Sequence, residues 1–137
     1  MKTLRSGALG LALLLLAPAL HAQVPQLLNY QGRVAVGTTA FDGSGSFKFA
    51  LVNGTGPTLL WKNDGSAGNT EPTAAVVLTV TKGLYSVQLG DTALPNMTAI
   101  PATVFANPDV RLRVWFDDGT ANGSQPLTPD QRIAAVG

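Results

Sequence analysis

Residues 73–91, T-A-A-V-V-L-T-V-T-K-G-L-Y-S-V-Q-L-G-D, decide the fold of this chain, because two alternating apolar runs flank a turn there. Six apolar residues recur at every second position of these runs: Val76, Leu78, Val80, Tyr85, Val87 and Leu89. Successive side chains of a β-strand point to opposite faces, so each run predicts a strand with one apolar face. Lys82-Gly83 separates the runs and suits a tight reversal, since glycine accepts a positive φ. We therefore predict a β-hairpin whose apolar face is covered by the rest of the chain.

Segments with similar alternation lie on both sides of this stretch. We predict strands at residues 26–36, 46–52, 58–62 and 110–116, and a short final strand after a turn within residues 127–134. The clearest pattern is that of Phe47, Phe49 and Leu51, which fall on one face. Gly32 interrupts the first segment, and a glycine within a strand often marks a β-bulge. We therefore expect a bulge at Gly32.

The whole pattern predicts an all-β fold. Six or seven short strands are separated by loops rich in Gly, Asn, Asp and Pro, and no helical period is sustained. We predict an antiparallel β-sandwich with an immunoglobulin-like outline, and a small β-barrel is the alternative. Residues 92–108 are expected to form a long crossing connection that closes one end of the core, with one helical turn at residues 101–105.

The start of the chain predicts export. Lys2 and Arg5 precede an apolar run at residues 8–19, and small residues stand at Ala19 and Ala22. This order is typical of a secretory signal helix, residues 1–22, and leaves residues 23–137 as a single β-sandwich domain. The run is shorter than the ~20 residues that cross a bilayer, so we expect no stable membrane span after cleavage. The predicted location is the periplasm, the cell surface or the medium.

Composition removes several functional classes. The chain has no cysteine, and its one histidine, His21, lies in the predicted signal segment. Without thiol or imidazole, the mature chain lacks the usual zinc ligand sets, cysteine nucleophiles and Ser-His-Asp triads. Two of the nine basic residues also leave with the signal, while all eight acidic residues remain. A near-neutral chain without a basic cluster is not expected to bind nucleic acid.

Aromatic residues predict a carbohydrate-binding alternative. Trp115, Trp61 and Tyr30 are candidates for a flat ring exposed to a sugar, and alternation places Trp115 on the opposite face from Val114 and Phe116, beside Arg113. The opposing interpretation is that both faces of that strand are covered, or that the ring closes an edge of the sandwich.

A polar turn contains a calcium candidate. Asp118, Thr120 and Asn122 occupy the first, third and fifth positions of a segment that resembles half of an EF-hand loop. The twelfth position is Pro129 instead of glutamate, so the ligand set is incomplete. A turn rich in Asp, Asn and Gly has the same composition for conformational reasons, and we expect neither a metal nor a cofactor.

Three segments together resemble one family of exported bacterial β-domains: P-Q-L-L-N-Y-Q-G-R at residues 25–33, G-L-Y-S-V-Q-L-G at 83–90 and L-T-P-D-Q-R-I at 127–133. Leu59-Leu60-Trp61 is also similar to a Leu-Trp strand of that family. The resemblance covers nearly all of the mature chain. It implies a poorly characterised domain that follows a signal peptide and precedes fibre-like or repeat regions of surface proteins. Asp130 departs from the family, which usually has a basic residue there.

These observations predict a non-enzymatic structural or adhesive module of the bacterial envelope or surface. Its partner would be another protein, or a second copy of the chain, bound through exposed strand edges. Carbohydrate binding through an exposed tryptophan is the alternative. A hydrolase is the remote alternative, because it needs two cooperating carboxylates and Asp117-Asp118 is the only adjacent pair.

Overall fold

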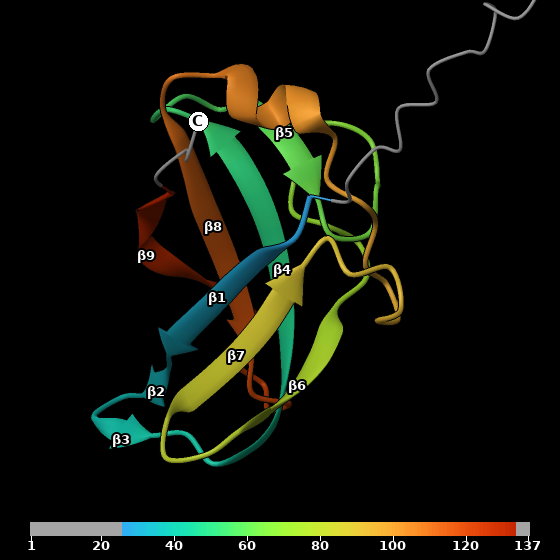
Figure 1. The fold of residues 1–137 in the computed structure, drawn as a ribbon. Helices are drawn as coiled ribbons and strands as arrows, with labels where there is room; N and C mark the ends of the chain where they lie inside the picture. The colour runs from blue at the N-terminus through green and yellow to red at the C-terminus, as the bar shows by residue number, and fades with distance from the viewer. Residues whose placement is uncertain (1–25, 134–137) are drawn as a thin grey trace, which may run out of the picture.

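The computed structural model describes residues 26–133, which form nine strands and one 3₁₀ helix (Figure 1). In chain order these are β1 (Leu28–Arg33), β2 (Ala35–Val36), β3 (Thr39–Ala40), β4 (Gly43–Asn53), β5 (Leu59–Lys62), β6 (Val76–Val80), β7 (Leu84–Leu89), η2 (Ala102–Ala106), β8 (Val110–Asp117) and β9 (Ser124–Ile133). The predicted signal helix lies outside the described residues. Within them, no helix has both the length and the apolar character needed to cross a membrane.

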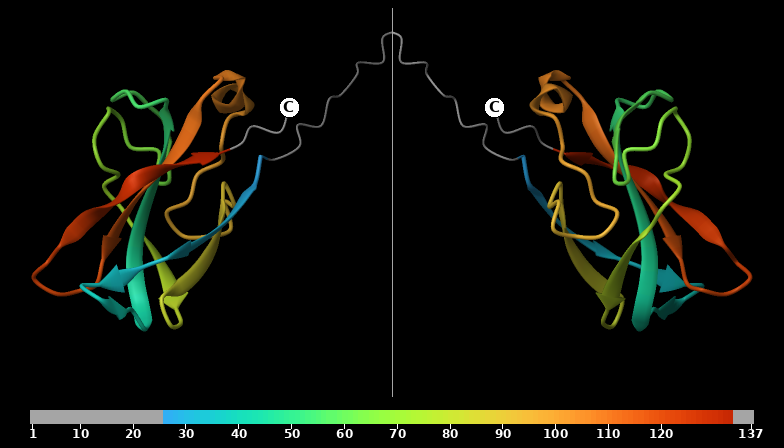
Figure 2. Two further views of the ribbon diagram at one scale, coloured as in Figure 1. Left: turned by 90° about the vertical axis from the view of Figure 1, so that its left-hand side faces the viewer. Right: turned by 90° about the vertical axis from the view of Figure 1, so that its right-hand side faces the viewer.

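The strands form a two-layered antiparallel sandwich, as the sequence predicted. One layer contains β1 and β7, and the other has the order β5-β4-β8-β9, with β6 also paired to β4. A small hairpin of β2 and β3 extends from β1. The side views of Figure 2 show how β1 and β7 lie across the larger sheet. The alternative small barrel is not formed, because β1 and β9 are not paired.

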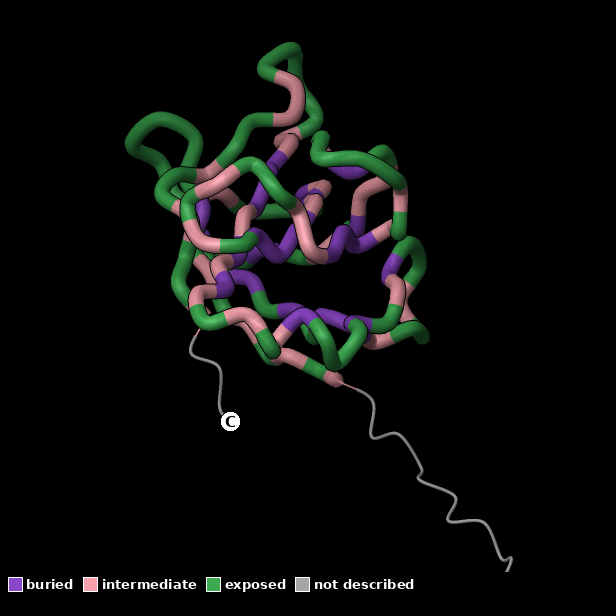
Figure 3. Tube along the Cα trace, turned by 90° about the horizontal axis from the view of Figure 1, so that it is seen from above, coloured by how far each residue is buried: buried purple, intermediate pink, exposed green. Residues whose placement is uncertain are grey.

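The core lies between the layers, on the face that alternation predicted. Phe47, Phe49 and Leu51 of β4 are fully buried, and Tyr85, Val87 and Leu89 of β7 are buried opposite them. Buried stretches of the two layers face each other when the molecule is seen from above (Figure 3). Apolar burial at ~25 cal/mol per Å² is the main stabilising term in a chain that has no disulfide.

The predicted hairpin of residues 76–89 is wrong, although its strands and its turn are correct. β6 pairs with β4 in the large sheet, whereas β7 pairs with β1 in the small one. The turn between them has positive φ at Lys82 (50°) and Gly83 (80°), and Thr81 and Leu84 exchange two backbone hydrogen bonds of 3.0 and 2.9 Å. After one bonded pair the strands diverge, because the apolar faces of β6 and β7 belong to opposite walls of the core.

Gly32 forms no bulge, which corrects a second prediction. The register of β1 against β7 is continuous from Leu28 to Arg33, and Gly32 lies directly opposite Tyr85. A Cβ atom at Gly32 would overlap the Tyr85 phenol ring. The glycine is therefore required because an aromatic ring from the neighbouring strand lies over its Cα.

Asn63 lies in the gap between β5 and β6, which pair with different parts of the same edge of β4. β5 pairs with β4 at Ala50–Val52, and β6 pairs with it at Gly43–Phe47. Between them, fully buried Asn63 accepts a hydrogen bond from Phe49 N–H through Oδ1 (2.9 Å). Its Nδ2 donates to Ala74 O and Asn96 O at 2.9 and 3.0 Å. One amide side chain thus continues the ladder across the gap.

The loop of residues 63–75 is held by Asp64. Burial raises the pKa of this carboxyl, but hydrogen bonds from the N–H groups of Ser66, Ala74 and Thr73 and from the Ser66 hydroxyl lower it to about 2. A pKa below the unfolded value of 3.8 means that the ionised carboxylate stabilises the fold above pH ~4. This contribution disappears as the pH falls through about 2.

Asp64→Asn should therefore lower the free energy of unfolding at pH 7 by about 1 to 2 kcal/mol, because charge-assisted hydrogen bonds to the loop are lost. The difference between the variant and the natural chain should shrink as the pH is lowered from 4 to 2. Urea denaturation at several pH values measures both effects. A difference that is constant over this range would show that the Asp64 charge does not hold the loop.

The connection from β7 to β8 crosses between the layers as predicted. It contains η2, which follows Pro101. Met97, Ile100 and Val104 are buried in the core cluster, so the connection closes one end of the sandwich.

The last strand is longer than the sequence predicted. β9 pairs with β8 from Ser124 to Ile133, but the register shifts between Leu112 and Val114. Three residues, Thr128 to Asp130, bulge opposite Arg113, and the Thr128-Pro129 peptide is cis. The Arg113 guanidinium donates two hydrogen bonds to Asp130, at 3.0 and 2.8 Å, which fixes the bulge. Asp130, the departure from the resembled family, therefore has a structural partner.

Candidate interaction site

An open seam separates the edge of the small layer from the edge of the large one. Residues of β1 and β2 form one rim, and residues of β9 form the other; these strands run alongside each other in the left view of Figure 2. Two hollows of about 120 and 330 Å³ follow each other along the seam and share Leu127. Leu112, Val114 and Phe116, the inward residues of β8, line their floor. We call this feature the β1–β9 seam.

The backbone of β1 has a partner on one side only. Val34 N–H donates to Gly83 O (2.8 Å), and antiparallel pairing alternates from there along the strand. The backbone groups of Leu28, Tyr30 and Gly32 therefore point toward β7. Those of Asn29, Gln31 and Arg33 point into the seam, where β1 has no partner among the described strands. These three residues are exposed and offer N–H and C=O groups to an added strand.

The facing edge of β9 is protected. Pro126 and Pro129 supply no N–H, and the bulge at residues 128–130 interrupts the strand between them. Native proteins use both devices to prevent edge pairing. β1 contains no proline, so the two rims of the seam differ in their capacity to bind another strand.

An aromatic cluster supports the rim formed by β1. The rings of Tyr30 and Tyr85 lie 6.1 Å apart between centroids, and the ring of Phe47 packs at a tilt against that of Tyr85, with centroids 4.3 Å apart. Burial raises the pKa of the Tyr85 hydroxyl, and its hydrogen bond with Tyr30 raises it further. Tyr85 is therefore un-ionised at physiological pH, and the cluster provides a rigid support instead of a titrating group.

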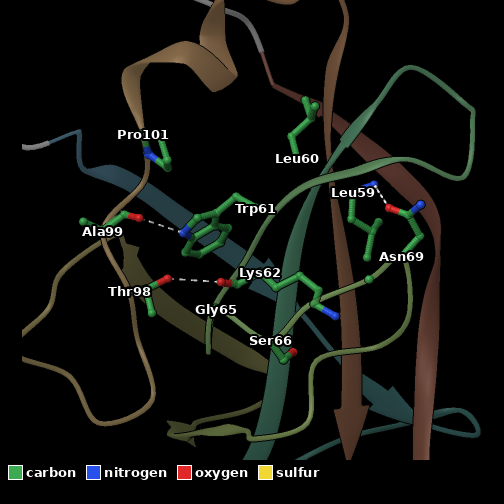
Figure 4. Close-up of a pocket in the computed structure, with 11 residues that line it drawn as sticks. Leu59, Leu60, Trp61, Lys62, Gly65, Ser66, Asn69, Thr98, Ala99 and Pro101 are labelled. Carbon is green, nitrogen blue, oxygen red and sulfur yellow. Dashed lines mark hydrogen bonds between the residues drawn. The ribbon is translucent and has the colours of Figure 1, made fainter.

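A third hollow, of about 360 Å³, lies at β5 and the loop of residues 63–75 (Figure 4). Lys62, which is 4% exposed, donates from Nζ to Ala67 O (3.1 Å) and Thr70 O (2.9 Å). None of the described residues that line this hollow is acidic. The ammonium group therefore fastens the loop over the outer face of the large sheet, and no carboxylate is placed beside it for acid–base chemistry.

The aromatic candidates for sugar binding are less exposed than predicted. Trp115 is 8% exposed and Trp61 is 6% exposed, so the expectation of exposed indole rings is wrong. Trp61 points into the core side and donates from Nε1 to Ala99 O (3.1 Å), as Figure 4 shows. Trp115 lies between Lys48 of β4 and Pro126 of β9 in register. Arg113 is engaged with Asp130, and Tyr30 is half-buried at the seam.

Covering of the outer sheet face explains the burial of Trp115. Lys48 reaches from β4 to Glu71 of the loop, with Nζ and Oε2 2.7 Å apart. Ala50 and Val52, also on this outer face, are fully buried. Both faces of the central strands are therefore covered, which is the opposing interpretation given by the sequence.

The three calcium candidates meet in the turn between β8 and β9, but they bind each other. Thr120 donates to Asp118 Oδ1 from its backbone N–H (2.9 Å) and from its hydroxyl (2.6 Å). Asn122 donates to Asp118 Oδ2 from Nδ2 (3.2 Å). These bonds lower the pKa of Asp118, the hydroxyl of Thr120 contributing most. The arrangement is that of a self-capped polar turn, and within residues 26–133 no group of three His, Cys, Asp or Glu side chains is placed to hold a metal ion.

Sequence patterns did not reveal the seam. β1 and β9 lie about a hundred residues apart in the chain, and whether two sheet edges pair or stay open leaves no periodic signal. The prolines of β9 could have indicated a free edge, because a strand that contains Pro126 and Pro129 is suited to the edge of a sheet.

Comparison with known families gives a match to the model described as "Domain of unknown function (DUF8740)" over residues 29–130. No curated protein and no solved structure matches the chain. The matched region begins in β1 and ends in β9, so it includes both rims of the seam.

Proposed function

Because this chain belongs to the DUF8740 family, whose function is unknown, we propose that it is an exported interaction module of the bacterial envelope or surface. The module is structural or adhesive and non-enzymatic, and it contacts a protein partner through the open edge of β1. The predicted signal peptide of residues 1–22 supports export.

One observation carries the proposal: β1 presents an edge that no strand within residues 26–133 pairs with and that contains no proline, beside the β1–β9 seam. Strand addition to such an edge is a common mode of peptide recognition, in which backbone hydrogen bonds supply affinity and alternate side-chain pockets supply specificity. The small layer has a second edge, on β7. β6 lies beside the start of this edge, because backbone hydrogen bonds between Thr81 and Leu84 hold the turn that joins the two strands.

The two alternatives have less support. Carbohydrate binding would require ring faces that Trp115 and Trp61 expose only slightly. A hydrolase would require paired carboxylates in one cleft, and none of the four hollows described for residues 26–133 is lined by more than one acid.

Gln31→Pro should abolish partner binding while preserving the fold. Its N–H points into the seam and is not needed by β7, so a proline is tolerated there but blocks an added strand. A photo-crosslinking amino acid at Gln131, on the opposite rim, should capture a partner in cells that express the full chain. Introducing Gln31→Pro should reduce this product at least about tenfold.

Matched variants define the outcome. Gln31→Thr keeps the N–H and should keep the crosslink, and a crosslinker at Gln88, on the outer face of β7, should give no such product. Asn29→Pro blocks the same edge at a second position. It provides an independent test of edge binding if Gln31→Pro does not fold. Equal crosslinking in folded natural and proline variants would refute edge binding, and retention of residues 1–22 in the mature protein would refute export.

A further inference from the structure

The β1–β9 seam also indicates what kind of segment binds. Resting on the proposed function, we infer that the partner contributes one extended strand with apolar side chains at alternate positions and an acidic side chain next to Arg33. This strand pairs with β1, and its apolar residues point toward the floor formed by β8.

The backbone of β1 has free hydrogen-bonding groups at the spacing of a β-strand. Asn29, Gln31 and Arg33 direct their N–H and C=O groups into the seam at every second residue. This spacing matches the hydrogen-bonding positions of one added strand. The other rim cannot form an equivalent hydrogen-bond ladder, because β9 contains Pro126, Pro129 and a bulge. The strand is therefore bound by main-chain groups of β1 and by side chains elsewhere.

The floor of the seam is a row of apolar side chains from β8. Leu112, Val114 and Phe116 recur at every second position of β8, so neighbouring members of this row stand about 6.8 Å apart along the strand. Alternate residues of an added strand repeat at the same distance. Leu127, the register partner of Val114, lines both hollows. The floor thus suits aliphatic side chains at alternate positions and disfavours charged ones there.

The two ends of the seam differ in charge. Arg33 is exposed at the rim and has no carboxylate within ion-pair distance among residues 26–133. Arg111 and Arg113, by contrast, are paired with Asp109 and Asp130. At the far end of the seam stands Asp118, whose carboxylate already accepts bonds from its own turn. An acidic residue is therefore favoured opposite Arg33, in the smaller hollow, and not beside Asp118 in the larger one.

A second copy of the chain fits this charge pattern poorly. Antiparallel pairing of two β1 strands about Gln31 would place Asn29 opposite Arg33, and β1 contains no carboxylate. Such a dimer would leave both Arg33 side chains without an acidic neighbour.

Two synthetic probes test the inference. Acetyl-Thr-Val-Thr-Val-Asp-Val-Thr-amide and the same peptide with Lys for Asp are titrated into the ¹⁵N-labelled chain from Gln23 onward. Backbone amide shifts of Asn29, Gln31 and Arg33 report binding. We expect a dissociation constant two- to fivefold lower for the Asp peptide, roughly the effect of one cross-strand charge pair.

Charge reversal provides the decisive comparison. Arg33→Glu should invert the preference between the two peptides, whereas Arg132→Glu, the same charge change on the outer face of the large sheet, should leave it unchanged. Gln31→Pro should abolish binding of both. An unchanged preference in Arg33→Glu would overturn the acidic assignment.

The remaining outcomes separate this inference from the proposed function. If neither peptide binds, but the crosslink at Gln131 is lost in Gln31→Pro, the edge-binding function stands and the inferred partner chemistry is wrong. If the Gln131 crosslink joins two copies of the chain, and sedimentation shows dimers that Gln31→Pro dissociates, the partner is the chain itself and the inference is overturned. If the peptides do not bind and the crosslink is insensitive to Gln31→Pro, both the edge-binding function and the inferred partner chemistry are refuted.

Discussion

Replacement of Asn63 by leucine should lower the free energy of unfolding by at least about 3 kcal/mol, the largest single effect expected in this fold. The variant would leave the buried Phe49 N–H without its acceptor, and the part-buried carbonyls Ala74 O and Asn96 O without their donor. Each buried polar group that loses its hydrogen bond costs about 1 to 3 kcal/mol. Domains of this size have a total stability of only about 5 to 15 kcal/mol, so the variant should be close to unfolding.

Urea denaturation followed by tryptophan fluorescence measures this loss. Gln88→Leu is the matched control, because it makes a similar amide-to-leucine change at an exposed position and should alter stability by less than about 0.5 kcal/mol. A leucine variant as stable as the control would mean that Asn63 does not bridge the gap between β5 and β6.

Gly32→Ala is the second large expected effect, a loss of about 1 to 3 kcal/mol from overpacking. The new methyl group would overlap the phenol ring of Tyr85. That ring cannot withdraw easily, because Phe47 and Tyr30 pack against it. Alanine normally stabilises a strand relative to glycine, so the sign of the effect itself identifies the aromatic contact.

A double-mutant cycle with Tyr85→Leu isolates that contact. In the leucine background Gly32→Ala should be neutral or stabilising, which gives a coupling energy of about 1 to 3 kcal/mol. Gly56→Ala serves as control, since its φ is ordinary and a Cβ there meets only Asn53 O at 3.6 Å. An additive cycle would show that the cost at Gly32 has another origin.

Both variants also bear on the β1–β9 seam. Gly32 and Tyr85 set the position of β1 on the core, and β1 carries the backbone groups that face the seam. Gly32→Ala should therefore weaken binding at the edge as well as stability. Asn63→Leu acts at the opposite edge of the large sheet, so its residual folded fraction should bind normally.

The candidate sites show where inference from the sequence stops. Alternation placed Trp115 on the outer face correctly, but its exposure depended on whether another segment covered that face. The covering segment is an irregular loop, held by Lys48 and Lys62 through contacts that no periodicity predicts. Asp118, Thr120 and Asn122 do meet, but only the geometry shows that they satisfy one another.

The sequence by itself determined that this chain is an antiparallel all-β sandwich and which residues form its core, because the alternation of β-strands is local and can be read without knowing the partners. It also determined the turn at Lys82-Gly83 and the proline at the start of η2. Only the tertiary structure decided that β6 and β7 lie in different sheets, and that β1 keeps one edge open. Strand pairing is settled by which apolar faces meet across the core and by which main-chain groups then remain unsatisfied, and both are properties of the assembled molecule.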